Sequence, residues 1–211
     1  MIRLRVNPLA PDPGTLAIAA ETIARGGVVA LPTDTLYGLA VDPRLEAAVA
    51  SLYRIKRRDA DHPLSVMAAD EAQVERCIGP LPDVARLLAR RFWPGPLTLV
   101  IEAAPELAAA LHSPTGRVAV RVPAHAIARE VAARAGSVVT ATSANRSGCP
   151  PSATADEVEA ALGSLVDLLL DAGPAPGGAP STVIDATGSV PVLLRAGAVT
   201  WERVLESVSS T

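Results

Sequence analysis

The sequence has few cysteines, no apolar leader and no long apolar run, and each of these absences argues against a particular class of protein. Its two cysteines, Cys77 and Cys149, lie far apart and match no metal-ligand spacing, which favours a reduced, intracellular chain. The N-terminal segment lacks the apolar core of a signal peptide, and no unbroken apolar run reaches membrane-spanning length. We therefore expect a cytoplasmic protein that does not contact the membrane.

Common catalytic and nucleotide-binding motifs are also missing. The sequence contains no GxxxxGK[ST] loop, no GxGxxG fingerprint, no HExxH and no GxSxG elbow. Its three histidines, His62, His112 and His125, have no cysteine or serine at a suggestive spacing, so a nucleophilic triad has weak support. The formal net charge of -3 argues against a general nucleic-acid coat, because phosphate contacts require a broad basic excess.

The 211 residues, of which 49% are hydrophobic, are enough to bury a sizeable core. Apolar spacing predicts helices over residues 15–25, 45–55, 70–78, 82–92, 125–135, 155–162 and 201–208. Short apolar runs predict strands over residues 28–31, 64–68, 97–101, 118–122, 138–141, 168–170, 183–185 and 192–194. This alternation, without a linker, predicts a single α/β domain over residues 1–211 with a mixed sheet flanked by helices.

Polar segments follow several of the predicted strands. The strand 28–31 leads into a loop with Thr33, Asp34 and Thr35, and the strand 138–141 leads into residues 142–148, TSANRSG. Open α/β sheets bind ligands at such strand ends, so we expect a binding site there. The alternative is that these side chains only complete turns or cap the helix 155–162, where Thr154 and Glu157 fit a capping box.

Positive charge is concentrated between residues 52 and 64, LYRIKRRDADHPL. Lys56 is the only lysine of the chain, and arginines occupy positions 54, 57 and 58 around it. These cations favour either an anion-binding site or simple capping of a helix carboxyl end. In the strand 118–122, Arg121 alternates with valines, and Arg117 lies four residues earlier on the same face. Such a pair indicates either an anionic partner or a solvated edge strand.

Several segments in order resemble the YrdC/Sua5 family of threonylcarbamoyl-AMP synthases. They are GGVVALPTDTLYGLAVDP, YRIKRRDADHPLSV, FWPGPLTLVI, VAVRVPAH, TATSANRSG, STVIDATG and LLRAGAV, and they extend from about residue 26 to residue 199. The chain is similar to the short, single-domain YrdC type, with only a C-terminal helix and tail at 201–211 after the motifs. The resemblance implies a twisted mixed sheet with a concave basic cleft.

The resemblance further implies an activity and its partners. The family makes L-threonylcarbamoyl-adenylate and pyrophosphate from L-threonine, bicarbonate and ATP. The product passes to the transferase machinery that modifies adenosine 37 of tRNA. The carbamate is already ionised, so the site needs positive charge and orientation more than a base. Mg²⁺ is expected with the triphosphate, and the sequence contains no dedicated metal motif.

By motif position, the resemblance assigns residues to two ligands. The expected threonine-binding residues are Thr35, Met67, Arg121, Ala141 and Ser181, where Met67 replaces an expected histidine. The expected ATP-binding residues are Lys56, Arg58, His62, Arg117, Ser143, Asn145, Ser152 and Arg195, with Lys56 and Arg58 as the catalytic cations. Lys56 is expected to be an exposed cation of the site.

Two other functions are compatible with the same motifs. The first is a non-catalytic module that binds double-stranded RNA or tRNA through a basic concave face, which the acidic overall charge disfavours. The second is a carbamoyl-transfer module like the related domain of hydrogenase-maturation proteins. Those proteins also carry acylphosphatase and zinc-finger parts, which this sequence lacks.

Overall fold

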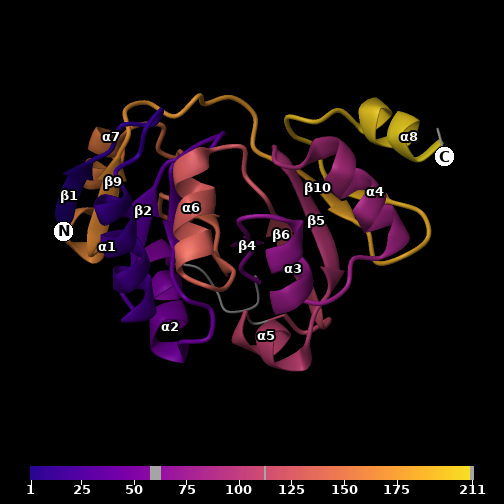
Figure 1. Ribbon diagram of the computed structural model, residues 1–211, viewed down its shortest axis with the longest axis horizontal. Helices are drawn as coiled ribbons and strands as arrows, with labels where there is room; N and C mark the ends of the chain where they lie inside the picture. Colours follow the sequence, from indigo (N-terminus) through magenta and orange to yellow (C-terminus); the bar gives the residue numbers. More distant parts are fainter. Residues whose placement is uncertain (58–62, 112, 210–211) are drawn as a thin grey trace.

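The strands form two mixed sheets that lie toward opposite ends of the molecule (Figure 1). The computed structural model describes residues 1–57, 63–111 and 113–209, and only the backbone of Ala108. The five-stranded sheet has the order β1 (Ile2–Arg5), β9 (Leu168–Asp171), β2 (Val29–Leu31), β3 (Gly38–Ala40) and β8 (Thr142–Ser143). The six-stranded sheet has the order β11 (Val192–Arg195), β10 (Thr182–Asp185), β5 (Leu97–Glu102), β6 (Arg117–Arg121), β4 (Val66–Met67) and β7 (Val139–Thr140).

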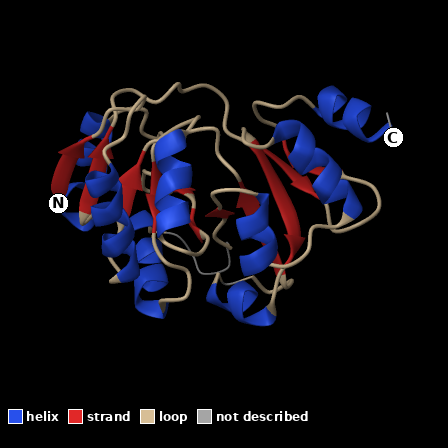
Figure 2. Cartoon of the chain, in the orientation of Figure 1, coloured by secondary structure: helices blue, strands red, loops and turns tan. Residues whose placement is uncertain are grey.

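Helices cover both sheets, so that most strands lie inside the molecule (Figure 2). They are α1 (Pro13–Ala24), α2 (Glu46–Lys56), α3 (Glu71–Cys77), α4 (Asp83–Phe92), α5 (Pro105–Ala110), α6 (Ala126–Arg134), α7 (Ala155–Leu162) and α8 (Trp201–Ser209). Helices α1 and α6 pack side by side, as do α4 and α8. Within the described ranges, no helix has the length and apolar character needed to cross a membrane.

Local chemistry explains where several helices begin. Asp12 and Asp70 each accept a hydrogen bond from the backbone amide three residues later, at 2.7 Å in both cases. Thr154 and Glu157 form the predicted capping box at the start of α7, with Glu157 N donating to Thr154 Oγ1 at 3.2 Å. The first turn of α7 is therefore capped by Thr154 and Glu157, as the sequence predicts.

The two sheets meet where the chain passes from β7 to β8 through Ala141. Thr140 pairs in the six-stranded sheet, and Thr142 pairs with Leu39 of the five-stranded sheet. The backbone amide of Ala141 donates to Ser65 O at 2.7 Å, just before β4. The strand ends of both sheets therefore face one another across this crossing.

The predicted α/β class and most of the predicted elements are confirmed, with the strands divided between two mixed sheets. The sequence analysis did not predict β1, β3, β8 or α5. The three strands have only two to four residues and α5 has six, and segments this short show little periodicity in their sequence. Strand β8 lies within the polar segment that was predicted to be a loop.

Candidate functional site

A cavity of about 800 Å³ lies between the two sheets and is large enough for a nucleotide with a small second ligand. Its walls come from β3, the end of α2, β4, β5, β6, the β7–β8 crossing and β11, which are far apart in the sequence. Nine of the predicted site residues line it, namely Thr35, Lys56, Met67, Arg121, Ala141, Ser143, Asn145, Ser181 and Arg195. The separate segments therefore converge as the sequence predicts, and their individual ligand contacts stay predictions.

The charge of the cavity wall is of one sign. Four cationic residues line it, Lys56, Arg57, Arg121 and Arg195. No Asp or Glu is among the lining residues in the part of the chain that the structure describes. A wall with this composition favours anions, and the low polarity of the surrounding protein strengthens the attraction. Beyond the cavity, a wider basic concave face stays a prediction.

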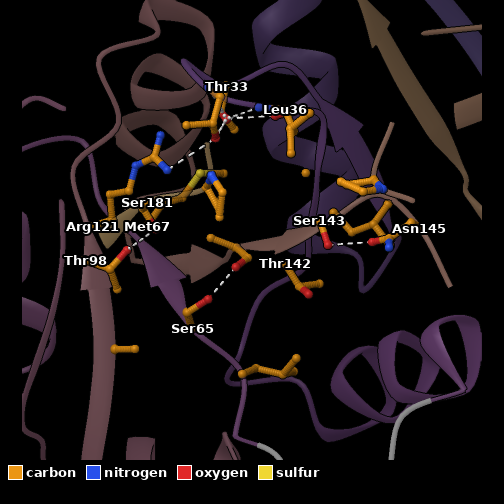
Figure 3. Close-up of a pocket in the computed structure, with 18 of the residues that line it drawn as sticks. Thr33, Leu36, Ser65, Met67, Thr98, Arg121, Thr142, Ser143, Asn145 and Ser181 are labelled. Carbon is orange, nitrogen blue, oxygen red and sulfur yellow. Dashed lines mark hydrogen bonds between the residues drawn. The ribbon is translucent and has the colours of Figure 1, made fainter. Parts of the chain in front are cut away.

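Figure 3 shows two groups of polar side chains on opposite sides of the cavity. Arg121, Thr98 and Ser181 lie on one side, next to Met67, while Ser143 and Asn145 lie on the other. Predicted threonine-binding residues thus lie on one side and predicted ATP-binding residues on the other, except that Arg195, predicted to bind ATP, lies beside Ser181. Which ligand each side binds stays a prediction.

At the first end, Arg121 is largely buried, with 12% of its side chain exposed. Its Nη1 donates to Thr35 Oγ1 at 3.4 Å, and its Nη2 donates to Asp34, with which it forms an ion pair. Burial lowers the pKa of Arg121, although the charge of Asp34 partly opposes that effect. The guanidinium keeps its charge at neutral pH and is suited to a carboxylate.

Arg195 lies close to the same end of the cavity. Its Nη2 donates to Ser181 O at 2.7 Å and to Ser181 Oγ at 3.1 Å. Ser181 Oγ and the hydroxyl of Thr98 form a further hydrogen bond of 2.8 Å. Burial lowers the pKa of Arg195, and the positive charge of Arg121 lowers it further, so the two guanidinium groups act on one region.

Lys56 is not the exposed cation that the sequence predicts, because only 3% of its surface is accessible. Its Nζ donates to the carbonyl oxygens of Ser143 at 2.6 Å and Asn145 at 2.9 Å, and to Asn145 Oδ1 at 3.2 Å. Its own carbonyl accepts from Ser147 N at 2.8 Å. The lysine thus holds the loop after β8 against the end of α2, and its charge contributes to the cavity wall from within the protein.

Two predicted ATP-binding residues lie elsewhere in the described structure. Arg117 is on the same face of β6 as Arg121, as predicted, but four residues along a strand span about 13 Å. It does not line the cavity, and it pairs with Asp185 at 2.9 Å. Ser152 is buried, and its hydroxyl donates to Ala144 O at 2.8 Å. The predicted ATP-binding residues Arg58 and His62 lie outside the described residues.

Several lining residues were assigned no ligand from the sequence, among them Arg57, Thr98 and Ser65. Thr98 had a signal, since it interrupts an otherwise apolar strand, Leu97–Ile101. Arg57 belongs to the predicted basic cluster, but the family motif assigned the nucleotide contacts to Lys56 and Arg58. Its backbone has φ 49° and ψ 45°, the left-handed conformation that ends α2. This conformation turns the chain at the rim of the cavity.

Comparison with known proteins identifies one family for this chain. The family model of Sua5, YciO and YrdC, described as "Telomere recombination", matches residues 21–197. A protein of Thiobacillus denitrificans named threonylcarbamoyl-AMP synthase is 38% identical over 80% of this chain and 89% of its own length. A protein of the same name from Bacillus subtilis is 37% identical over 94% of this chain but only 58% of its own length.

Among solved structures, Sua5 of Pyrococcus abyssi in complex with L-threonine superposes with a TM-score of 0.92 and 36% sequence identity. The match covers 98% of this chain and 61% of that protein. The chain therefore corresponds to about three-fifths of the longer relatives and to most of the shorter ones.

Proposed function

The chain belongs to the Sua5/YciO/YrdC family, and we propose that it is an L-threonylcarbamoyladenylate synthase, a nucleotidyltransferase that uses L-threonine, bicarbonate and ATP. The observation that carries this proposal is a cavity of about 800 Å³ with cations at both ends and no carboxylate among its described lining residues. The product would pass to the machinery that threonylcarbamoylates tRNA.

The reaction would proceed in two bond-forming steps. The neutral amine of threonine adds to the carbon of bicarbonate, and loss of water gives the N-carboxylate. An oxygen of this carbamate then attacks the α-phosphorus of ATP, and the bond to the β-phosphate oxygen breaks to release pyrophosphate. Because the nucleophile is already an anion, the enzyme's task is to bring two anions together and to stabilise the leaving group.

The amino-acid end would position threonine through Arg121. Its guanidinium fits the α-carboxylate, and Thr35, Ser181 and Thr98 offer hydroxyl groups around it. Ala141 would contribute main-chain groups, and Met67, 3% exposed, an apolar contact for the side-chain methyl. The proposed place of threonine is thus next to the crossing between the two sheets.

The nucleotide end would hold the triphosphate near the end of α2. Arg57 lines this wall directly, while Lys56 contributes charge and fixes the backbone of Ser143 and Asn145. Arg58, His62, Arg117 and Ser152 stay predicted nucleotide contacts. The charge that develops on departing pyrophosphate would be stabilised by these cations.

Mg²⁺ would enter as part of the nucleotide substrate. In residues 1–57, 63–111 and 113–209, no group of three or more His, Cys, Asp or Glu side chains is placed to hold a metal ion. That donor set does not fit a protein-bound cage, whereas Mg²⁺ commonly binds phosphate oxygens and water with few protein ligands. The chain's own residues would therefore bind the metal only through the triphosphate.

Measurement of pyrophosphate release tests this proposal. Purified protein with ATP, Mg²⁺, bicarbonate and threonine should release pyrophosphate, and omission of any one of them should stop the release. Release that continues without threonine would reject the proposal. Salt-dependent RNA binding without any turnover would instead favour the non-catalytic alternative, for which the described cavity offers no specific support.

A further inference from the structure

Asp34 forms the ion pair with Arg121 from outside the cavity. Arg121 lines the cavity, whereas Asp34 is not among the lining residues. Both side chains are largely buried, with 12% of Arg121 and 13% of Asp34 exposed. Asp34 belongs to the loop between β2 and β3, which also carries Thr35, so one short segment contacts the guanidinium at two of its nitrogens.

The pair is not arranged as a purely structural salt bridge would be. Buried arginine–carboxylate pairs are commonly bidentate, with two parallel hydrogen bonds. Here Arg121 Nη2 donates to Oδ1 of Asp34, while Asp34 Oδ2 and Arg121 Nε are both buried without a hydrogen-bond partner. The arrangement leaves Nη1 directed to Thr35 Oγ1 at the cavity wall. The pair lacks the second hydrogen bond of a bidentate pair, and the direction of the guanidinium is set instead by its two bonds to the Asp34–Thr35 segment.

The fixed direction matters because the cavity must sort two kinds of anion. A nucleoside triphosphate carries several negative charges, and a mobile arginine in a cavity with three other cationic residues would be drawn toward it. A guanidinium tied to a buried carboxylate stays at its own end. Burial alone would also lower the pKa of Arg121, and the charge of Asp34 opposes this.

We propose that Asp34 is a positioning residue that keeps Arg121 at the amino-acid end of the cavity, so that the site selects the α-carboxylate of an amino acid over phosphate at that position. This inference rests on the proposed function. It predicts that loss of the Asp34 charge weakens threonine binding selectively and leaves nucleotide binding unweakened. A competing arrangement, in which Asp34 occupies the place of the substrate carboxylate, predicts the opposite sign for threonine.

Binding measurements on matched variants test the inference. Threonine and Mg-ATP are titrated separately into the wild-type protein, Asp34→Asn and Asp34→Glu by calorimetry, with thermal melting to confirm folding. The control is Asp42→Asn, because Asp42 is also buried, pairs with Arg44 at 2.6 Å and lies away from the cavity. Both Asn substitutions remove a buried carboxylate that neutralises an arginine.

We expect Asp34→Asn to raise the Kd for threonine about tenfold to a hundredfold, as displacement of a positioning group by about 1 Å can do, with no increase in the Kd for Mg-ATP. Asp42→Asn should change neither constant. If Asp34→Asn does not fold, Asp34→Glu decides, since its longer side chain displaces Arg121 and should weaken threonine binding while ATP binding is kept.

Three outcomes overturn the inference. They are an unchanged or tighter threonine Kd in the folded Asp34 variant, equal losses for threonine and ATP, and an effect of the same size in Asp42→Asn. Failure of the proposed function is recognised separately, because in that case the wild-type protein itself does not bind threonine.

Discussion

Lys56 ties the end of helix α2 to Ser143 of β8 and to Asn145 in the loop after it through hydrogen bonds from its ammonium group. Substitution by methionine keeps the aliphatic stem but leaves buried carbonyl oxygens without donors. We expect Lys56→Met to lower the free energy of unfolding by about 2–4 kcal/mol, as the loss of buried hydrogen-bond partners usually does. Urea denaturation of the variant measures this loss.

Arg54→Met is the matched control, because Arg54 is exposed on the same helix. Its effect on stability should stay within about 0.5 kcal/mol, as for most surface substitutions. If Lys56→Met is as stable as this control and loses only activity, the lysine acts as the phosphate-binding site cation that the sequence predicts, and the structural role is contradicted.

Arg57 has a backbone in the left-handed conformation, and the residue lines the cavity. The left-handed conformation costs a side-chain-bearing residue about 1–2 kcal/mol, and glycine adopts it freely at an entropic cost of about 1 kcal/mol in the unfolded chain. Arg57→Gly should therefore not lower the Tm. It should raise the Kd for Mg-ATP about tenfold, since a hydrogen bond to a charged group contributes about 1.5 kcal/mol.

Arg57→Ala separates the two effects. It should lose the same nucleotide affinity but melt at a lower temperature than the glycine variant, because alanine keeps the strain. Wild-type affinity for Mg-ATP in both variants would show that Arg57 does not contact the nucleotide.

Among the secondary-structure elements, β1 pairs with β9 through the backbone, and one arginine of β1 adds ion pairs to β9 and α7. Arg3 pairs with Asp171 at 2.8 Å and with Asp156 and Glu159 at 2.7 Å each. Burial raises the pKa of Asp171, but the hydrogen bonds from Arg3 and from the amide of Gly173 lower it by more, so its net pKa lies below the ordinary value.

The sign of the resulting pH dependence follows from linkage. The unfolded chain takes up the proton first, at a pKa of about 3.9, so the stabilisation by Asp171 is complete above that pH and is lost as the pH falls through the lower pKa of the folded state. The stability difference between the wild-type protein and Asp171→Asn should therefore be largest near neutral pH and shrink below about pH 4. A difference that does not change with pH in urea titrations would contradict this.

How far the elements could be predicted depended on their length and on where their polar groups turned out to bond. The segments that became β2, β5, β6 and β10 were predicted because their residues are mostly apolar, and the polar loops after β2 and β7 indicated the cavity. Strands β3 and β8 were hidden, because two or three residues pair only when the tertiary structure brings them together.

The predicted site shows the same limit. Thr35, Arg121 and Ser181 were identified from motifs and do line the cavity. Burial of Lys56 and Ser152 was not predictable, since their acceptors are carbonyl groups of residues distant in sequence or in a loop. The ion pair of Asp34 with Arg121 joins residues 87 positions apart, and no local sequence pattern predicts it.

The two sheets as a whole enclose the proposed ligands, so binding should stabilise the complete fold. A ligand at a hundred times its Kd contributes about 2.7 kcal/mol to the free energy of unfolding. We expect Mg-ATP and threonine each to raise the Tm, and the two together to raise it by at least the sum. Serine, which lacks the methyl group that Met67 is placed to contact, should give a smaller shift.

Equal shifts for threonine and serine would contradict the proposed role of Met67. No shift with any amino acid would count against an amino-acid end in this cavity, whereas a shift with Mg-ATP alone would leave only its nucleotide end supported.

The most direct measurement follows the carbon atom of bicarbonate into the product. The protein is incubated with ¹³C-bicarbonate, Mg-ATP and threonine, and the nucleotide products are analysed by mass spectrometry. We expect an adenylate that contains both threonine and the labelled carbon, formed together with pyrophosphate. A threonine adenylate without the label, or no adenylate at all from a protein that binds both substrates, would contradict it.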